Sequence, residues 1–262
     1  MSPAMGLYPV RVARTAVLGP NLRRVTLAGE LLDRFPFAGP DQRVKLLLPL
    51  PGQQRPHVEG VAGPRDVLDM PAEIRPVMRT YTIRGHRPDA GEVDIDFALH
   101  GGAADSGPAS AWAMTARPGD HAALYGPAAS YEPPADASWQ LLAGDESALP
   151  AIGAILDHRP DALASTVFVE LADPRDAQPL RTGDGVEVRW LDRGGRRAKD
   201  STLLLEAVRG LALPVEPGYV WLAGESSVVT TLRRHLVNET GLDRERVTFT
   251  GYWRHGRSEN DN

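Results

Sequence analysis

The first segment with residues suited to chemistry is 79–84, which reads Arg-Thr-Tyr-Thr-Ile-Arg. Its β-forming residues predict a strand in which Arg79, Tyr81 and Ile83 share one face. The planar guanidinium of Arg79 can bind a phosphate through two parallel hydrogen bonds. Tyr81 offers an aromatic face to a flat ring, and the Thr82 hydroxyl can donate to a ring nitrogen. The segment therefore predicts a binding site for a ligand that carries both a phosphate and a flat ring.

A second segment, residues 100–112, supplies a complementary group for that phosphate. It begins with His100-Gly101 and continues through Gly-Pro-Ala-Ser at residues 107–110. Gly followed by Pro and small residues predicts a helix that starts with Pro in its first turn. A helix start offers free backbone N–H groups and the positive end of the helix dipole, which suits a phosphate. We expect the start formed by Gly107, Pro108, Ala109 and Ser110 to face the same ligand as Arg79.

Two turns in the second half of the chain share one composition. Residues 143–148 read Ala-Gly-Asp-Glu-Ser-Ala, and residues 223–227 read Ala-Gly-Glu-Ser-Ser, each after an apolar run. In an open parallel sheet, a ligand lies beyond the carboxyl ends of the strands. Two interpretations remain open: the serines Ser147 and Ser226 only cap helices, or the turns border a ligand that approaches the glycine backbone. Neither turn contains Gly-x-Gly-x-x-Gly, so no separate dinucleotide fingerprint is present.

The first half of the chain predicts an antiparallel barrel. Several short strands, with one helix at 109–116 between the last two, are typical of that architecture. In the alternating run 92–99 we expect Val93, Ile95, Phe97 and Leu99 to face the core and the acidic residues between them to face out. Lys45 interrupts an apolar strand and fits either an edge lysine that snorkels or a ligand contact. The strands are expected at 8–15, 22–28, 44–48, 79–84, 92–99 and 121–125, with a Pro-rich loop at 51–78 that contains a helical turn near 65–70.

The second half predicts a doubly wound parallel α/β sheet, because apolar strands alternate with helical segments. A linker containing Pro133-Pro134 separates the halves and suggests two domains, residues 1–130 and 131–262. The expected strands are 139–143, 166–171, 186–190, 219–223 and 247–250, and the expected helices are 147–158, 202–209 and 227–240.

Composition excludes several classes of protein. The formal net charge is −5 without a long basic run, which argues against a nucleic-acid partner. The chain has no Cys and only seven scattered His, so we expect no iron–sulfur cluster and no bound metal. Neither a leader peptide nor an apolar stretch of about 18 residues is visible, which predicts a cytoplasmic protein without an integral membrane segment.

The motifs in order resemble a known family. Arg-x-Tyr-Thr at 79–82, followed by His-Gly-x₅-Gly-Pro-Ala at 100–109, resembles the flavin-binding signature of the ferredoxin-reductase-like flavoproteins. Residues 144–152 and the tail Gly-Tyr-Trp-Arg at 251–254 are similar to the siderophore-interacting proteins, the ferric-siderophore reductases, over nearly the whole chain. The resemblance implies a Greek-key barrel that binds FAD, then an α/β domain that binds NADPH or NADH, with the C-terminal segment returning to the flavin.

The resemblance also implies roles for particular residues. A hydride would pass from the nicotinamide to the flavin, and single electrons would pass to a ferric siderophore without a catalytic acid or base. A ferredoxin is an alternative donor. The implied flavin contacts are Arg79, Tyr81, Thr82, His100, Gly107, Pro108, Ala109 and Ser110. The implied nicotinamide contacts are Asp145, Glu146, Ser147, Ala148, Gly224, Glu225 and Ser226. Tyr252 and Trp253 would cover a ring face, and Lys45 and Arg254 would bind the substrate.

Several alternatives stay open within that resemblance. A carboxylate of the two turns can hold a ribose hydroxyl, while Arg233 or Arg234 takes a 2′-phosphate. Ala128 stands where the family often has a basic residue, so either Arg84 or His86 substitutes or strongly anionic triscatecholates are disfavoured. Tyr252 and Trp253 also fit a simple aromatic cap on the sheet end. The rival functions are a flavin oxidoreductase with another acceptor and a siderophore-binding protein without enzymatic activity.

Overall fold

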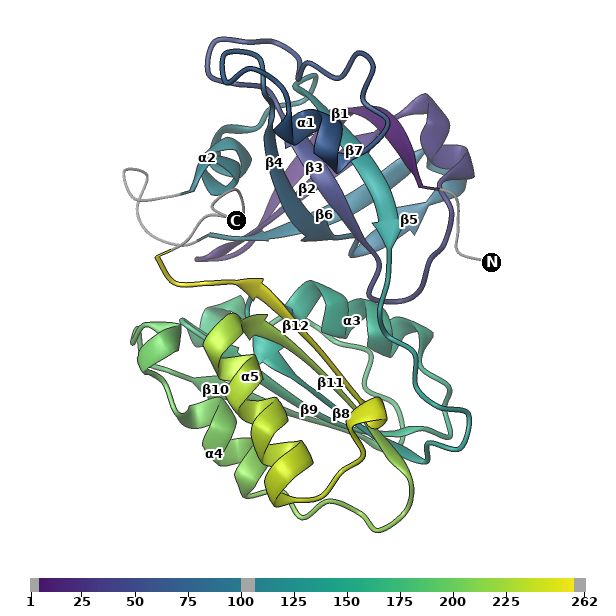
Figure 1. The fold of residues 1–262 in the computed structure, drawn as a ribbon, viewed down its shortest axis with the longest axis vertical. Coiled ribbons are helices and arrows are strands. Elements are labelled where there is room, and N and C mark those ends of the chain that lie inside the picture. Colours follow the sequence, from purple (N-terminus) through teal and green to yellow (C-terminus); the bar gives the residue numbers. More distant parts are fainter. Residues whose placement is uncertain (1–4, 100–106, 257–262) are drawn as a thin grey trace. The chain divides into compact units, whose positions relative to one another are not determined.

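The computed structural model describes residues 5–99 and 107–256, and the chain divides into two compact units between Ala129 and Ser130 (Figure 1). Each unit has its own sheet and its own core. No helix in the described part of the chain is both long and apolar enough to cross a membrane.

The first unit is a curled, antiparallel seven-stranded sheet that forms a half-barrel (Figure 1). Its strand order is β4-β3-β7-β1-β2-β6-β5, and β7 returns from far along the chain to pair with β1, which is a Greek-key connection. The strands are β1 (Gly6–Gly19), β2 (Leu22–Ala28), β3 (Arg43–Leu48), β4 (Val77–Thr82), β5 (Gly85–Arg87), β6 (Glu92–Ala98) and β7 (His121–Ala128).

One face of this sheet carries the core that the alternating sequence predicted. Val93, Ile95 and Phe97 of β6 are fully buried, and helix α2 (Pro108–Thr115) packs against them through Ala109 and Ala113. Apolar side chains at every second position can pack here because successive strand residues point to opposite faces. The same cluster includes Val10 and Val12 of β1 and Val25 and Leu27 of β2.

The opposite face of β3 and β4 has a smaller core. Leu47 and Met78 pack there against Val61 and Val67, which come from the Pro-rich excursion after β3. Val67 belongs to the short helix α1 (Pro64–Leu68), close to the helical turn expected near 65–70. The long loop therefore has a structural role, since it covers apolar surface that would otherwise be exposed.

The acidic residues of β6 do not face solvent, and that prediction was wrong. Asp94 and Asp96 are only 6 and 7% exposed. Arg24 binds Asp96 at 2.6 and 2.8 Å, and Arg87 binds Asp94 at 2.7 and 2.8 Å. The periodicity placed these acids correctly on the face opposite the core, but arginines from β2 and the short strand β5 cover that face. Strand β5, which the sequence analysis missed, supplies Arg87.

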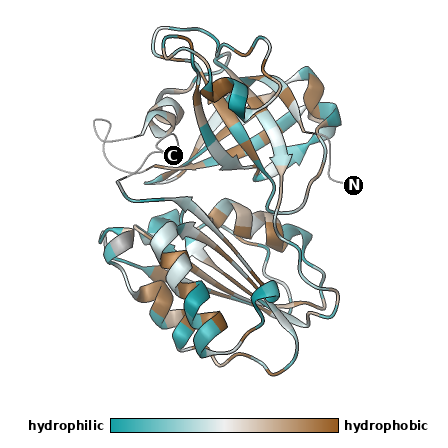
Figure 2. Cartoon of the chain, in the orientation of Figure 1, coloured by the Kyte–Doolittle hydropathy of each residue, from teal (hydrophilic) through white to brown (hydrophobic). Residues whose placement is uncertain are grey.

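The second unit is a five-stranded parallel sheet in the order β10-β9-β8-β11-β12. Its central strands are largely brown, and thus apolar, as buried parallel strands should be (Figure 2). Helix α3 covers one face of the sheet, and α4 and α5 pack together on the other (Figure 1). The strands are β8 (Trp139–Asp145), β9 (Ala164–Leu171), β10 (Val186–Asp192), β11 (Gly218–Glu225) and β12 (Val247–Trp253); the helices are α3 (Leu149–His158), α4 (Leu203–Arg209) and α5 (Ser226–Arg234).

Candidate functional site

In the first unit, strand β4 and helix α2 lie together, as the two motifs predicted. Tyr81 of β4 packs on Phe97 with 4.4 Å between ring centroids, and Phe97 lies 6.0 Å from Trp112 of α2. Arg79 shares the face of Tyr81 and donates from Nη1 to the Met78 carbonyl at 2.7 Å. Thr82 ends the strand and is buried. An aromatic contact chain therefore connects the strand that carries Arg79 to the helix.

The start of α2 has the chemistry of an anion site. Among the described residues, no side chain caps this helix, and its first turn contains no acid. Gly107 is the N-cap, and a Cβ added there would meet no atom within 4 Å. Pro108 has no N–H, so the backbone N–H groups of Ala109 and Ser110 are those that the helix geometry directs outward. His100, the remaining residue of the motif, lies outside the described residues.

Lys45 is not on a sheet edge, so that interpretation was wrong. Strand β3 lies between β4 and β7, and Lys45 pairs in register with Thr80 and Tyr125. Its Nζ donates to Thr80 Oγ1 at 2.8 Å. Ala128 ends β7. The His86 ring contacts the Leu32 carbonyl at 2.7 Å and packs edge-on against Phe35. His86 therefore already makes structural contacts within the first unit.

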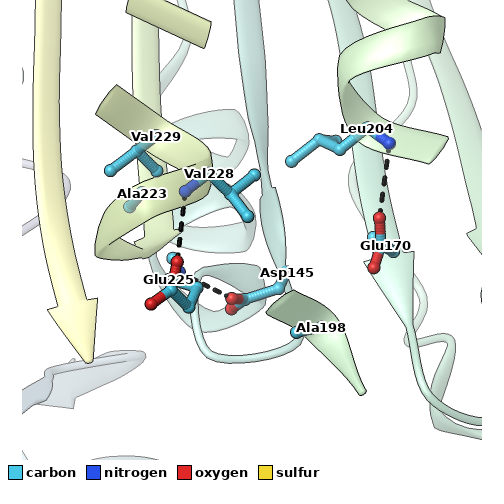
Figure 3. Close-up of a pocket in the computed structure, with 9 residues that line it drawn as sticks. Asp145, Glu170, Ala198, Leu204, Ala223, Glu225, Val228 and Val229 are labelled. Carbon is cyan, nitrogen blue, oxygen red and sulfur yellow. Dashed lines mark hydrogen bonds between the residues drawn. The ribbon is translucent and has the colours of Figure 1, made fainter. Parts of the chain in front are cut away.

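The carboxyl edge of the second unit holds a small pocket (Figure 3). The strand order reverses between β8 and β11, and such a switch point is where open α/β sheets bind ligands. Both turns singled out in the sequence contribute to it. The pocket is lined by Asp145, Glu170, Ala198, Leu204, Ala223, Gly224, Glu225, Val228 and Val229.

Asp145 joins three strand ends. Its Oδ1 accepts hydrogen bonds from Ser147 N at 2.9 Å and Ser147 Oγ at 2.5 Å. Its Oδ2 accepts from Glu225 N and from Trp253 Nε1, both at 2.9 Å. Burial, helped by the neighbouring Glu146 carboxylate, raises the pKa of Asp145. Gly224 adopts φ +141°, and a Cβ there would lie 2.7 Å from Asp145 Oδ2, so the carboxylate itself requires glycine.

Glu225, and not a serine, caps α5. Its Oε2 accepts from Val228 N at 3.1 Å (Figure 3). It also accepts from Ser227 N at 2.6 Å and from Ser227 Oγ. Burial works against ionisation, but these hydrogen bonds outweigh it and lower the pKa of Glu225. Ser226 instead donates to the Trp253 carbonyl at 2.9 Å. The interpretation of Ser147 and Ser226 as caps is corrected, because carboxylates reach the N–H groups of these turns.

Glu146 belongs to a buried ion triad. Arg193 binds it with contacts of 2.5 and 2.8 Å and lies 3.5 Å from Glu170. Burial raises the pKa of Glu170. Sequence reasoning missed Arg193, and the one signal for it is its position directly after strand β10. Ala148, the last residue of the first turn, is buried and serves as the N-cap of α3.

The terminal aromatic residues lie within the last strand and not beyond it, because β12 continues to Trp253. Tyr252 contacts Trp221 edge-on at 6.3 Å, while the Trp253 indole binds Asp145. Arg254 is exposed. Arg233 stacks on Phe249, 4.8 Å from the ring centroid, beside the middle of β12 and away from the carboxyl edge.

Comparison with known proteins now identifies the family. The family model described as "Siderophore-interacting FAD-binding domain" matches residues 11–131, and the model described as "Siderophore-interacting protein" matches residues 137–256. The chain belongs to the siderophore-interacting protein family. The resemblance drawn from the motifs is therefore confirmed.

Relatives of this family member include named reductases. It is 34% identical to the ferric vibriobactin reductase ViuB of Vibrio cholerae, over 97% of this chain and 92% of ViuB. It is 31% identical to an NADPH-dependent ferric-chelate reductase of Escherichia coli, over 92% of this chain and 91% of that protein.

Solved structures agree. The siderophore-interacting protein SipS of Aeromonas hydrophila matches with a TM-score of 0.79 and 35% identity, over 97% of this chain and 93% of SipS. A ferredoxin NADP⁺ reductase of Neisseria gonorrhoeae, at 13% identity and a TM-score of 0.63, shares the fold. The predicted fold class is thus confirmed as ferredoxin-reductase-like.

Proposed function

We propose that this protein is an FAD-dependent ferric-siderophore reductase, in which the first unit binds FAD and the second binds NADPH or NADH as the electron donor. The observation that carries the proposal is the start of α2, where no side chain of the described residues caps the helix and the first turn holds no acid, linked to the strand that bears Arg79. This start lies inside the segment that matches the siderophore-interacting FAD-binding model. The named reductases among the relatives support the same reaction.

The residues of the first unit fit the pyrophosphate of a flavin dinucleotide. The N–H groups of Ala109 and Ser110 would donate to it, and Arg79 would pair with its charge. Tyr81 would lie against the ring system with its own ring fixed by Phe97. FAD, when bound, supplies the conversion of a two-electron donor into single electrons for iron. The protein contributes position, charge and exclusion of water.

In the second unit, the turns at residues 145–148 and 224–226 would border the nicotinamide. Their carboxylates already accept hydrogen bonds from the turns themselves, so they give the pocket a rigid wall. Trp253, held through its indole N–H by Asp145, would present a fixed aromatic surface at the same edge. The negative charge of this wall disfavours a pyrophosphate beside it.

For the ferric substrate, Lys45 and Arg254 would supply positive charge. The iron arrives inside the siderophore as substrate, and hard oxygen chelators hold iron(II) less tightly than iron(III), so reduction releases it. Within residues 5–99 and 107–256, no group of three or more His, Asp or Glu is arranged to hold a metal. We place the reaction in the cytoplasm, with a ferredoxin as the alternative donor.

An anaerobic titration of the purified protein tests this proposal. NADPH or NADH should bleach the flavin absorbance, and subsequent addition of a ferric siderophore should restore it while an iron(II) indicator dye reports the product. Restoration by quinones but not by ferric siderophores would favour a different flavin oxidoreductase. A colourless protein that binds siderophore and retains no FAD would contradict the proposal.

A further inference from the structure

The carboxyl edge of the parallel sheet has an acidic centre and a flank that carries exposed arginines. Asp145 and Glu225 form the centre at the ends of β8 and β11, and their carboxylates take up the N–H groups of the turns. The flank consists of the loops after β9 and β10, where Arg175, Arg196 and Arg197 are exposed, Arg175 in contact with Asp173 and Arg197 in contact with Asp200. A dinucleotide carries several negative charges, and an exposed arginine of the flank can pair with one of them.

The two loops of the flank are joined to each other. Arg193 N donates to the Leu171 carbonyl at 3.1 Å, and Gly195 N donates to the Ala172 carbonyl at 3.3 Å. These bonds continue the pairing of β9 with β10 beyond the last strand residues. The two loops therefore lie side by side at the carboxyl ends of β9 and β10, and β9 is the strand next to β8.

The loop after β9 holds a carboxylate and a guanidinium in direct contact. Asp173 Oδ1 accepts from Arg175 Nε at 2.9 Å, and Oδ2 accepts from Nη2 at 2.5 Å. Arg175 lowers the pKa of Asp173 to about 2, so both groups are charged at neutral pH. The Arg175 side chain is 74% exposed. An exposed ion pair is weak and can exchange partners readily.

Position and chemistry together indicate a ligand for this pair. In dinucleotide-binding sheets, an acid on a loop after the first turn binds the ribose 2′-hydroxyl of NADH, or an arginine nearby accommodates the 2′-phosphate of NADPH. Here both groups are present and bound to each other. We propose that Arg175 binds the 2′-phosphate of NADPH and that Asp173 tunes the preference for NADPH over NADH by competing for the same guanidinium. This inference rests on the proposed function, since it requires a nicotinamide donor.

The pair predicts two opposite effects. Arg175→Ala removes the partner of the phosphate and frees Asp173 for a ribose hydroxyl, so the preference for NADPH should fall about tenfold. Asp173→Asn keeps an oxygen that can accept from Arg175 N but removes the competing charge, so the preference should rise about threefold. General damage to the unit cannot move the preference in both directions.

A matched control lies on the neighbouring strand. Arg189 is also an exposed arginine paired with a carboxylate two residues away, Glu187, at 2.7 Å. It lies within β10, short of the carboxyl edge. Arg189→Ala removes the same charge and a similar ion pair, and it should leave the preference for NADPH unchanged.

The experiment uses the full-length, FAD-loaded protein and its three variants. Calorimetry compares the affinity for adenosine 2′,5′-bisphosphate with that for adenosine 5′-monophosphate, and stopped-flow absorbance compares kcat/KM for flavin reduction by NADPH and NADH. We expect wild type to bind adenosine 2′,5′-bisphosphate more tightly than adenosine 5′-monophosphate and to have a higher kcat/KM with NADPH than with NADH. Both preferences should fall in Arg175→Ala, rise in Asp173→Asn and stay unchanged in Arg189→Ala. If wild type shows no preference, or if Arg175→Ala keeps the wild-type preference, the inference is overturned. If neither nucleotide reduces a flavin that dithionite does reduce, the proposed donor fails, while the calorimetric ratio still decides the Arg175 site.

Discussion

Two helix starts in this protein share one backbone geometry and have opposite chemistry. At the start of α2, within the described residues, no side chain caps the helix and no acid is present in the first turn. At the start of α5, Glu225 accepts from both Ser227 N and Val228 N. The first start can bind an anion from solution, whereas the N–H groups of the second already bind the carboxylate of Glu225. The same structural element would thus serve as a phosphate site in one unit and as a rigid wall in the other.

The comparison also explains how the two nucleotides would be held differently. FAD would meet backbone N–H groups at α2, which need a phosphate to satisfy them. A nicotinamide dinucleotide would find the corresponding groups at the centre of the second sheet already satisfied by Asp145 and Glu225. Its charge must then be met by side chains such as Arg175, which makes the donor site open to adjustment by substitution.

The largest effect should come from removing the acid at the centre of the second unit. Asp145→Ala leaves Glu225 N and Trp253 Nε1 without their acceptor in a buried turn. We expect the free energy of unfolding to fall by about 3 kcal/mol, measured by chemical denaturation. The control is Asp243→Ala, which removes an exposed carboxylate that accepts from Glu245 N at 3.0 Å and should cost about 1 kcal/mol or less. Equal effects of the two substitutions would contradict the account of Asp145.

On the first unit, Arg79→Ala tests whether a side chain assists the open helix start. Loss of a charge-assisted hydrogen bond to the pyrophosphate is worth about 1.5–3 kcal/mol, so the dissociation constant of FAD should rise about tenfold to hundredfold. Fluorescence titration of the apoprotein with FAD measures this change. Arg117, an exposed arginine just after α2, provides the control, because Arg117→Ala removes equal charge outside the motif. An Arg79→Ala variant that binds FAD with wild-type affinity would remove Arg79 from the site.

The cap of α5 predicts a dependence of stability on pH. Because the folded protein lowers the pKa of Glu225, the carboxylate contributes stability above its unfolded pKa near 4.5, and that stability is lost as pH falls through the folded value. Glu225→Gln should cost about 1 kcal/mol at pH 7, and the difference from wild type should shrink as the pH falls below about 4.5. Denaturation curves between pH 3 and 7 measure it, and a difference that stays constant with pH would show that the charge is irrelevant.

The smallest effects should appear at the substrate. Lys45→Ala and Arg254→Ala should each raise the KM for an anionic ferric siderophore about two- to fivefold, because single charges that are not fully buried contribute little. The effect should diminish at high salt, since the Debye length falls from about 10 Å at 0.1 M to about 3 Å at 1 M. A neutral ferric chelate is the control. An identical ratio of anionic to neutral substrate in both variants and wild type, at every salt concentration, would exclude these residues as counter-charges.

The sequence predicted the fold well because the fold depends on local patterns. Alternation placed Val93, Ile95 and Phe97 in the core, and the apolar strands of the second half indicated a parallel sheet. The three-residue strand β5 was not predicted because it is too short to show an alternation of apolar and polar residues. The burial of Asp94 and Asp96 was also not predicted, since their partners Arg24 and Arg87 come from other strands.

The candidate sites show a similar limit. The turns around Asp145 and Glu225 were located by composition, but the partners of their carboxylates depend on the approach of β8, β11 and β12. Capping by serine was one of two interpretations of these turns, but Glu225 caps α5 and Asp145 accepts from Ser147 N. The sequence did not predict a site at Asp173-Pro174-Arg175, although this segment follows the second strand of the parallel sheet along the chain.

The contrast between α2 and α5 is tested most directly by giving α2 the acid that α5 has. Gly107 has φ −58° and open space in front of it, so Gly107→Asp can place a carboxylate over the N–H groups of Ala109 and Ser110. Gly107→Asn is the control, because it offers a similar cap without the charge. We predict that the dissociation constant of FAD, measured by fluorescence titration of the apoproteins, rises at least about tenfold in Gly107→Asp and stays within about threefold of wild type in Gly107→Asn. Wild-type affinity in both variants would contradict the assignment of this helix start as the phosphate site.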